Sequence, residues 1–463
     1  MRNMTIETIT GAVEGRLENA GKSDLSKEAS SVVIDSRLIE EGGVFVATRG
    51  QRVDGHAFIN KAFEDGALAA ICEELPDRPK GPCIVVKDSL EALRKLAAFY
   101  RKQLSVKIVG IVGSVGKTST KEIVASVLSS HFEVLFTEGN LNNEIGVPLT
   151  VFKIRDGHEV AVIEMGISDF GEMDRLGQIV HPDIVVFTNI GPCHLENLVD
   201  LDGVFRAKTE IIPHMPENGL ILINGQDEKL SGITIHSSGG RKIVRYGKES
   251  KRDDVYASNI ENLGLDGSKF VANFPDNSHY DMTIPYPGYH MVDNAMAAAA
   301  VGFFMGLNLE EIRRGMQSAP QISGRGYIIH TERYTILDDC YNANPKSMCA
   351  AIDTLGYALG RKVAILGDMF ELGEESEKLH REVGEYAASH GVDSLIVVGT
   401  SAKYMYEQAR LHEGLELRYY PNRELLINAV SDETKDILMQ GDTILVKASH
   451  GMGFSEVVDY LKK

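Results

Sequence analysis

The 463-residue sequence contains no tryptophan and only five cysteines, none of which forms a CxxC pair or a zinc-type spacing. We therefore expect buried or incidental thiols in a reducing compartment, not a disulfide framework. The longest apolar stretch, 295–307, is interrupted by glycines and is too short to span a bilayer. Residues 1–21 lack the apolar core of a signal peptide. These absences predict a cytoplasmic protein that does not insert into a membrane.

Positive charge is also scarce. Lys and Arg number 48 against 66 Asp and Glu, which gives a formal net charge of −18 at pH 7. A surface of this sign disfavours nucleic acid and anionic membranes as partners. The hydrophobic content of 43% is ordinary for a globular protein, and the length suggests about three domains of ~150 residues each.

Short apolar runs alternate with helical patterns along the whole chain, which predicts an α/β fold. In residues 1–105 this alternation indicates a small α/β domain. In residues 106–320, Val/Ile runs such as 108–112 and 184–187 indicate parallel strands buried on both faces of a sheet, whereas 243–284 looks more antiparallel. Residues 321–463 form a further α/β unit, with strands expected at 335–337, 363–366, 395–398 and 444–446.

A glycine-rich segment follows the run at 108–112 and precedes a helical stretch at 120–130. Strand, glycine loop and helix is the context of a P-loop, in which backbone N–H groups and the helix N-terminus bind phosphate. We expect Lys117 to reach the β- and γ-phosphates and the Thr118 hydroxyl to bind Mg²⁺. The alternative is a glycine turn with a surface lysine. The predicted ATP-binding loop is Gly113, Ser114, Val115, Gly116, Lys117, Thr118 and Ser119, although the usual GxxxxGK[ST] spacing would need glycine at Ile111.

Polar residues follow two of the other expected strands of this sheet. Glu164 ends the run at 160–163, and His194 comes seven residues after the run at 184–187. Strand ends at the carboxyl edge of a parallel sheet face the ligand crevice, and a carboxylate there suits Mg²⁺. A solvent-exposed carboxylate and a loop histidine without function are the alternatives. Lys208 lies in a helical stretch, where a solvated charge is the ordinary interpretation.

A helix is expected to open at residues 289–294. His290 and Asn294 are four residues apart and so share one face of it. An asparagine amide can donate to and accept from an adenine edge, whereas helix capping is the simpler alternative.

Taken together, these motifs resemble the Mur ligase family from about Asp35 to the C-terminus. The motifs that carry the resemblance, in chain order, are Asp35-Ser-Arg37, the phosphate loop, Asn140-Leu-Asn-Asn-Glu144, Glu164-Met-Gly166, Asn189-Ile-Gly…His194, Ala207-Lys208, His290…Asn294, Gly324-Arg325, Asp338-Asp-Cys-Tyr-Asn-Ala-Asn-Pro345, Gly367-Asp-Met…Glu371-Leu-Gly373 and Leu445-Val-Lys447. Two departures are Met291, where members often have asparagine, and His450, where Lys-Gly-Ser-Arg would place arginine.

The resemblance implies three domains: a UDP-sugar-binding domain (1–105), a central P-loop ATPase domain with a parallel sheet (106–320), and a Rossmann-like domain for the incoming amine (321–463). Several runs resemble those of the family member that joins D-alanyl-D-alanine to UDP-N-acetylmuramoyl-tripeptide with ATP and Mg²⁺. The resemblance therefore implies an ATP-dependent amide ligase, expected to be a monomer, that forms its product through an acyl phosphate.

The family pattern also assigns expected roles to individual residues. Lys117, Glu164, His194 and Lys208 match catalytic positions, and Thr118, Glu164, His194 and a CO₂-derived carbamate on Lys208 match metal ligands. Asn294, Arg325 and Asp339 match nucleotide contacts. Residues expected on the substrate side are Ser36, Arg37, Asn142, Asn143, Tyr341, Asn342 and Asn344.

Some alternatives stay open at this point. Another Mur-type ligase or a folylpolyglutamate-type ligase would share the ATP chemistry, and a P-loop regulatory protein would bind ATP without ligation. The last residue of the tripeptide, lysine or diaminopimelate, is also left open by the sequence.

Overall fold

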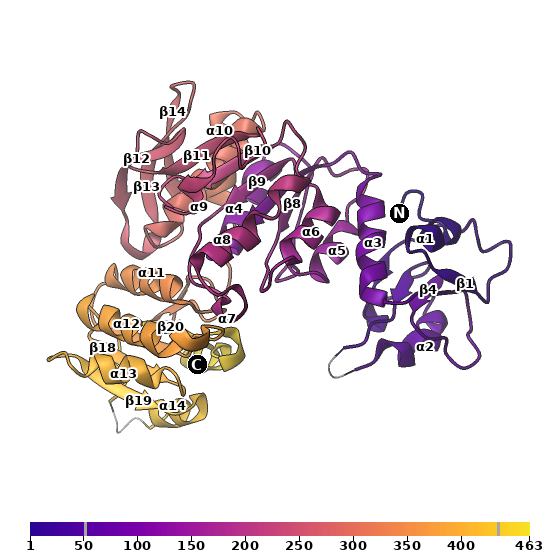
Figure 1. Cartoon of the computed structure of the whole chain (residues 1–463). Helices are drawn as coiled ribbons and strands as arrows, with labels where there is room; N and C mark the ends of the chain where they lie inside the picture. The colour runs from indigo at the N-terminus through magenta and orange to yellow at the C-terminus, as the bar shows by residue number, and fades with distance from the viewer. Residues whose placement is uncertain (51–52, 433–435) are drawn as a thin grey trace.

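The computed structural model describes residues 1–50, 53–432 and 436–463, and these form three lobes, each built on its own sheet (Figure 1). The lobes follow one another along the chain. The central lobe lies between the other two, so the molecule is extended.

The N-terminal lobe contains a five-stranded sheet with the order β1-β5-β4-β3-β2. Its strands are β1 (Arg16–Glu18), β2 (Val32–Val33), β3 (Val44–Val46), β4 (Ala69–Cys72) and β5 (Cys83–Val85), and its α-helices are α1 (Ile6–Ala12), α2 (Ile59–Glu64) and α3 (Ser89–Arg101). The small α/β domain expected in residues 1–105 is confirmed.

Helix α3 joins this lobe to the central one. The Asp88 side chain caps its N-terminus, and Leu93, Leu96 and Tyr100 lie on its buried face. The Tyr100 hydroxyl donates to the Ile154 carbonyl at 2.7 Å, across the boundary between the lobes. The last turn of α3 is thereby held against the central lobe.

The central lobe has a nine-stranded sheet with the order β14-β13-β12-β11-β10-β9-β6-β8-β7. The strands are β6 (Lys107–Val112), β7 (Val134–Phe136), β8 (Val160–Glu164), β9 (Ile184–Phe187), β10 (Leu220–Asn224), β11 (Lys242–Lys248), β12 (Val255–Asn262), β13 (Ser268–Asn273) and β14 (His279–Ile284). Pairing is parallel from β7 as far as β12 and antiparallel only for β12–β13 and β13–β14. The antiparallel interpretation of 243–284 was thus wrong for β11, which extends the parallel sheet.

Helices cover both faces of this sheet, as its continuous Val/Ile strands predicted. One face packs against α4 (Lys117–Ser129), α9 (His290–Phe304) and α10 (Leu309–Ser318). The other face packs against α5 (Gly146–Val151), α6 (Glu172–Val180) and α8 (Leu201–Thr209). Functional side chains can therefore gather at the carboxyl edge of the sheet, where neither helical layer covers the strand ends.

The C-terminal lobe has a six-stranded sheet with the order β15-β16-β20-β17-β18-β19. Its strands are β15 (Tyr327–His330), β16 (Thr335–Asp338), β17 (Lys362–Gly367), β18 (Ser394–Val398), β19 (Glu416–Tyr420) and β20 (Thr443–Lys447), and its α-helices are α11 (Pro345–Gly356), α12 (Ser376–Ser389), α13 (Lys403–Ala409), α14 (Arg423–Val430) and α15 (Ser455–Leu461). Only β15 is antiparallel to its neighbour. The α/β fold class with three lobes agrees with the prediction.

The structure also bears on the predictions about membrane insertion and about the cysteines. No helix in the described part of the chain is long and apolar enough to cross a membrane. All five cysteines are free, and four of them are buried.

Candidate active site

The glycine loop lies between β6 and α4, in the strand–loop–helix context that the sequence predicted. Gly113 and Gly116 have φ angles of 155° and 82°, which residues other than glycine rarely adopt. A Cβ on Gly113 would lie 1.9 Å from the Thr188 hydroxyl oxygen. Gly116 is the N-cap of α4, whose first residue is Lys117. The Ser114 and Val115 N–H groups donate to Asn189, and the N-terminus of α4 at this loop supplies the positive end that an anion site requires.

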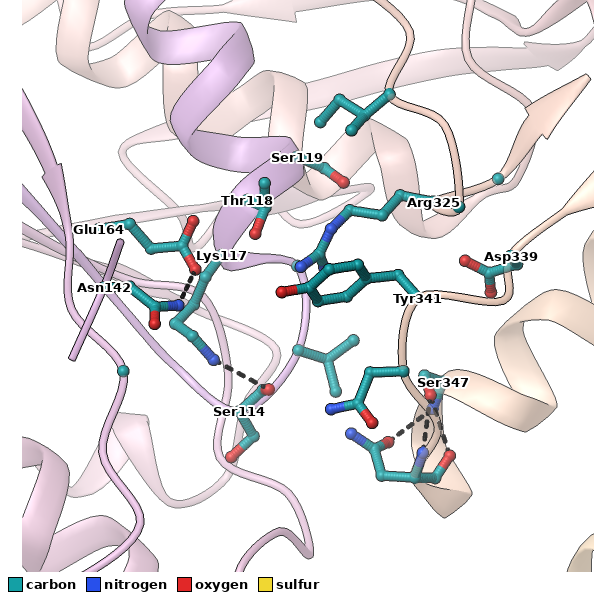
Figure 2. Close-up of a pocket in the computed structure, with 18 of the residues that line it drawn as sticks. Ser114, Lys117, Thr118, Ser119, Asn142, Glu164, Arg325, Asp339, Tyr341 and Ser347 are labelled. Carbon is teal, nitrogen blue, oxygen red and sulfur yellow. Dashed lines mark hydrogen bonds between the residues drawn. The ribbon is translucent and has the colours of Figure 1, made fainter. Parts of the chain in front are cut away.

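Lys117 lies folded against its own loop. Its Nζ donates to the carbonyl oxygens of Gly113 at 2.8 Å and Ser114 at 3.3 Å (Figure 2). Burial, followed by the charge of the nearby Lys208, lowers the Lys117 pKa to about 8. No carboxylate of the described residues lies within ion-pair distance of its ammonium group, which leaves this cation available to an anionic ligand.

Glu164 stands at the end of β8 and is only 1% exposed, so the solvent-exposed alternative is wrong. Its Oε1 accepts a hydrogen bond from the Asn142 amide at 2.7 Å (Figure 2). Its buried Oε2 has no hydrogen-bond partner in the described structure. Because buried polar atoms are nearly always paired, an oxygen in this state fits a donor or a cation that binds there.

His194 and Lys208 both lie in the segment that follows β9, His194 at the start of α7 (Leu195–Leu198) and Lys208 on α8. His194 precedes α7 in a left-handed conformation with φ 52°. Its Nδ1 lies 2.6 Å from an oxygen of Glu371, which belongs to the C-terminal lobe.

Lys208 lies on α8 and is 1% exposed, so the interpretation as a solvated charge is wrong. Its Nζ has no hydrogen-bond or ion-pair partner among the described residues, and burial lowers its pKa. An amine that is buried, unpaired and of lowered pKa is unusual for a structural lysine.

A cavity of about 650 Å³ opens between the central and C-terminal lobes, and its wall includes the first turn of α3. Most of the predicted site residues line it, namely Ser114, Val115, Gly116, Lys117, Thr118, Ser119, Asn142, Asn143, Glu164, His194, Asn294, Arg325, Asp339, Tyr341, Asn342 and Asn344. Gly113, Lys208, Ser36 and Arg37 do not. The Lys208 charge is nonetheless close enough to lower the Lys117 pKa.

The wall from the C-terminal lobe is built around one aromatic ring. The Arg325 guanidinium lies 4.0 Å from the centre of the Tyr341 ring (Figure 2), and the His450 ring lies 5.2 Å from it. Lys447 binds Asp339 at 2.6 Å and the Asn342 carbonyl at 2.9 Å. An aromatic ring beside a fixed planar cation offers a stacking surface and charge together.

The first turns of α9 bring His290 and Asn294 into the same wall. No side chain caps α9, so capping does not explain either residue. The Asn294 amide donates to the Met291 sulfur at 3.3 Å. Its oxygen lies 3.1 Å from where a Cβ on Gly116 would stand. Asn294 therefore sits directly against the phosphate loop.

Three of the predicted substrate residues have clear local roles. Arg37 is 86% exposed on its side chain and pairs with Asp35 at 2.6 Å in the N-terminal lobe. The Asn143 side chain accepts from the Gly146 N–H at 2.9 Å at the start of α5. Asn344 caps α11 by accepting from the Ser347 N–H at 2.9 Å (Figure 2). Asn143 and Asn344 thus shape the cavity wall through helix ends.

Arg94, Lys447 and Glu371 also line the cavity but were not among the predicted site residues. Lys447 and Glu371 lie in motifs that the sequence singled out, and Lys447 ends a buried strand, β20. The position of Lys447 at the end of a buried strand could have identified it from the sequence. Arg94 lies on a helix of another lobe, and nothing in its spacing indicated the cavity.

Family models match almost all of this architecture. The Mur ligase family catalytic domain matches residues 28–101, the Mur ligase middle domain 111–302, and the Mur ligase glutamate ligase domain 324–450. The chain belongs to the Mur ligase family. Within the family it is 35% identical to the UDP-N-acetylmuramoyl-tripeptide–D-alanyl-D-alanine ligase of Escherichia coli K12, over 100% of this chain and 99% of that one.

Solved structures give the same relationship. MurF from Acinetobacter baumannii superposes with a TM-score of 0.90 at 31% identity, covering 99% of both chains. MurF from Thermotoga maritima in complex with ADP has a TM-score of 0.82 at 28% identity, covering 93% of this chain and 97% of that one.

Proposed function

We propose that this Mur ligase joins D-alanyl-D-alanine to UDP-N-acetylmuramoyl-tripeptide at the expense of ATP, giving the pentapeptide, ADP and phosphate. The observation that carries the proposal is end-to-end similarity, at 35% identity, to a ligase of that name. The cavity supports it, because a phosphate loop on one lobe faces a cationic and aromatic wall on another. An enzyme that joins two substrates needs such a shared site.

The reaction starts from a carboxylate, which is a poor acyl donor at neutral pH. Its oxygen attacks the γ-phosphorus of ATP, the bond to the β-phosphate oxygen breaks, and an acyl phosphate and ADP form. Both reactants are anions, so their approach needs fixed positive charge. Lys117 supplies it, aided by the N–H groups of the loop and the N-terminus of α4. The Asn294 amide, Arg325 and Asp339 contact the nucleotide.

The amine of D-alanyl-D-alanine then attacks the acyl carbon. The C–N bond forms, phosphate leaves, and the amine loses a proton to a base. The Rossmann-like lobe, residues 321–463, holds this dipeptide, with Tyr341, Asn342 and Asn344 in its wall. The N-terminal lobe, residues 1–105, holds the UDP-sugar through Ser36 and Arg37, while Asn142 and Asn143 contact the same substrate from the central lobe, residues 106–320. The enzyme works as a cytoplasmic monomer.

The donor groups around the phosphate loop fit Mg²⁺. Thr118 and Glu164 would hold a first ion, and His194 and a carbamate on Lys208 would hold a second; Glu164 has an unpaired buried oxygen suited to a cation. Bound there, Mg²⁺ would neutralise phosphate charge. Lys208 as an ammonium would repel a metal, whereas its buried, unpaired amine with a lowered pKa is suited to take up CO₂.

The test is mass spectrometry of the products formed from ATP, D-alanyl-D-alanine and each of two tripeptide precursors, ending in lysine or diaminopimelate. A panel of free amino acids replaces the dipeptide in parallel reactions. We expect a product heavier by the dipeptide less one water, with ADP release that requires both substrates. Equal turnover with free lysine, diaminopimelate or glutamate would assign the chain to another activity of the family.

A further inference from the structure

We propose that Glu371 is a positioning residue for His194, so that the C-terminal lobe orients a metal ligand of the central lobe. The inference rests on the proposed function, because it takes His194 as a ligand of Mg²⁺. It concerns which lobe of the protein orients the imidazole ring of that ligand.

The contact that carries the proposal joins the two lobes. An Oε2 atom of Glu371 lies 2.6 Å from His194 Nδ1. Nδ1 is buried but makes no aligned hydrogen bond, so the carboxylate lies beside it and off the N–H direction. With Nδ1 facing this carboxylate, Nε2 is the ring nitrogen left for a metal. Metal-binding imidazoles usually give their other N–H to a carboxylate or carbonyl, which fixes the ring.

Both residues of this contact have an unusual backbone conformation. His194 has φ 52° and Glu371 has φ 63°, a left-handed conformation that residues other than glycine rarely adopt. Such conformations persist only where the surroundings determine them, and they cluster at functional sites. Here both residues direct their side chains at each other, from loops that belong to different lobes.

Packing around the pair explains what holds these conformations. Leu195, the first residue of α7, packs against the hydrophobic core of the C-terminal lobe. The short 3₁₀-helix η6 (Gly373–Glu375) of the same lobe also contacts α7, and a Cβ on Gly373 would lie 3.5 Å from the Glu196 Cα. The segment that carries His194 is therefore seated on the C-terminal lobe and would lose Glu371 if that lobe moved away.

The experiment measures metal binding to the full-length protein with a non-hydrolysable ATP analogue, using Mn²⁺ and electron paramagnetic resonance. We expect Glu371→Ala to weaken Mn²⁺ binding at the site that His194 would form about 10-fold or more, the range for loss of a group that orients a metal ligand. Glu371→Gln keeps an acceptor oxygen and should restore part of the affinity. Glu374→Gln is the matched control, since this exposed carboxylate lies three residues away and makes no ion pair or hydrogen bond with His194 in the described structure, and it should bind as wild type.

A double-mutant cycle separates positioning from a general effect on folding. If Glu371 acts through His194, Glu371→Ala should add no further loss of Mn²⁺ affinity in a His194→Ala background. Additive losses, or wild-type affinity in Glu371→Ala, would overturn the proposal. Dipeptide-dependent ADP release by the wild-type enzyme tests the underlying function separately. Its absence would remove both conclusions, whereas normal release with an unaffected Glu371→Ala would remove only this one.

Discussion

Replacing Lys208 with methionine should stabilise the protein while abolishing its activity. The Lys208 amine is buried on α8 without a partner among the described residues, and a buried polar group without a partner destabilises a fold by about 1–3 kcal/mol. Methionine has a similar length and no polar group to desolvate. At about 2–4 °C per kcal/mol for a lobe of this size, the melting transition should rise by about 2–12 °C.

A second buried lysine provides the matched control. Lys121 is also fully buried, on α4, but its Nζ donates to the Thr137 carbonyl at 2.7 Å and pairs with Glu122 at 2.6 Å. Lys121→Met leaves both partners unsatisfied and should therefore destabilise by about 1–3 kcal/mol. The two substitutions are chemically the same, so opposite changes in the free energy of unfolding would reflect the different partners of the two amines.

Calorimetry in bicarbonate-free buffer measures the stability effect, and ADP release measures activity. The variant Lys208→Ala should be nearly inactive, and small carboxylates such as formate or acetate should restore part of its activity, because they replace the carbamate oxygens. The reasoning is refuted if Lys208→Met loses as much stability as Lys121→Met. A fully active Lys208→Ala enzyme would remove the residue from the mechanism.

Three further outcomes are expected. Lys117→Ala should abolish ADP release with the fold intact by circular dichroism, and near-normal release would mean that the ATP site is assigned wrongly. The pKa of Lys117, about 8, lies below the usual lysine value, so the unfolded chain binds more protons and the free energy of unfolding should rise between about pH 8 and 10; urea unfolding should show a smaller rise for Lys117→Met. His450→Arg should leave turnover near normal with at most a change in the dipeptide KM, and complete inactivation would show that the site has been rebuilt around histidine.

The central strands were predictable because they are buried on both faces. Strands at the edges of the sheets were harder to find. The runs at 108–112 and 184–187 lie in β6 and β9, whose residues are almost all buried, as unbroken Val/Ile stretches predict. Strands β15 and β19 were missed because they lie at the sheet edges and contain half-buried polar residues. Edge strands carry a weaker hydrophobic pattern, so the sequence alone identifies them poorly.

The burial of Lys208 leaves a signal in the sequence. Val204 and Lys208 are four residues apart on α8 and share its buried face. A helical lysine on the same face as an apolar residue is a candidate for burial. By contrast, Asp339 and Lys447 meet because β16 and β20 are neighbours, although 108 residues separate them. Strand order cannot be read from periodicity, and the same holds for His194 and Glu371, which meet only where two lobes touch.

Charge pairing in the cavity wall indicates how the lobes share the nucleotide. Arg94 lies 3.7 Å from Glu144, and Lys447 lies 2.6 Å from Asp339, so each already has a carboxylate beside it. Among the described residues, Lys117 and Arg325 have none: one contacts loop carbonyls and the other an aromatic ring. These unpaired cations belong to the central and C-terminal lobes respectively. In a protein with a net charge of −18, anion binding must come from such local groups. A polyphosphate that satisfies both cations therefore favours the arrangement in which the lobes are together.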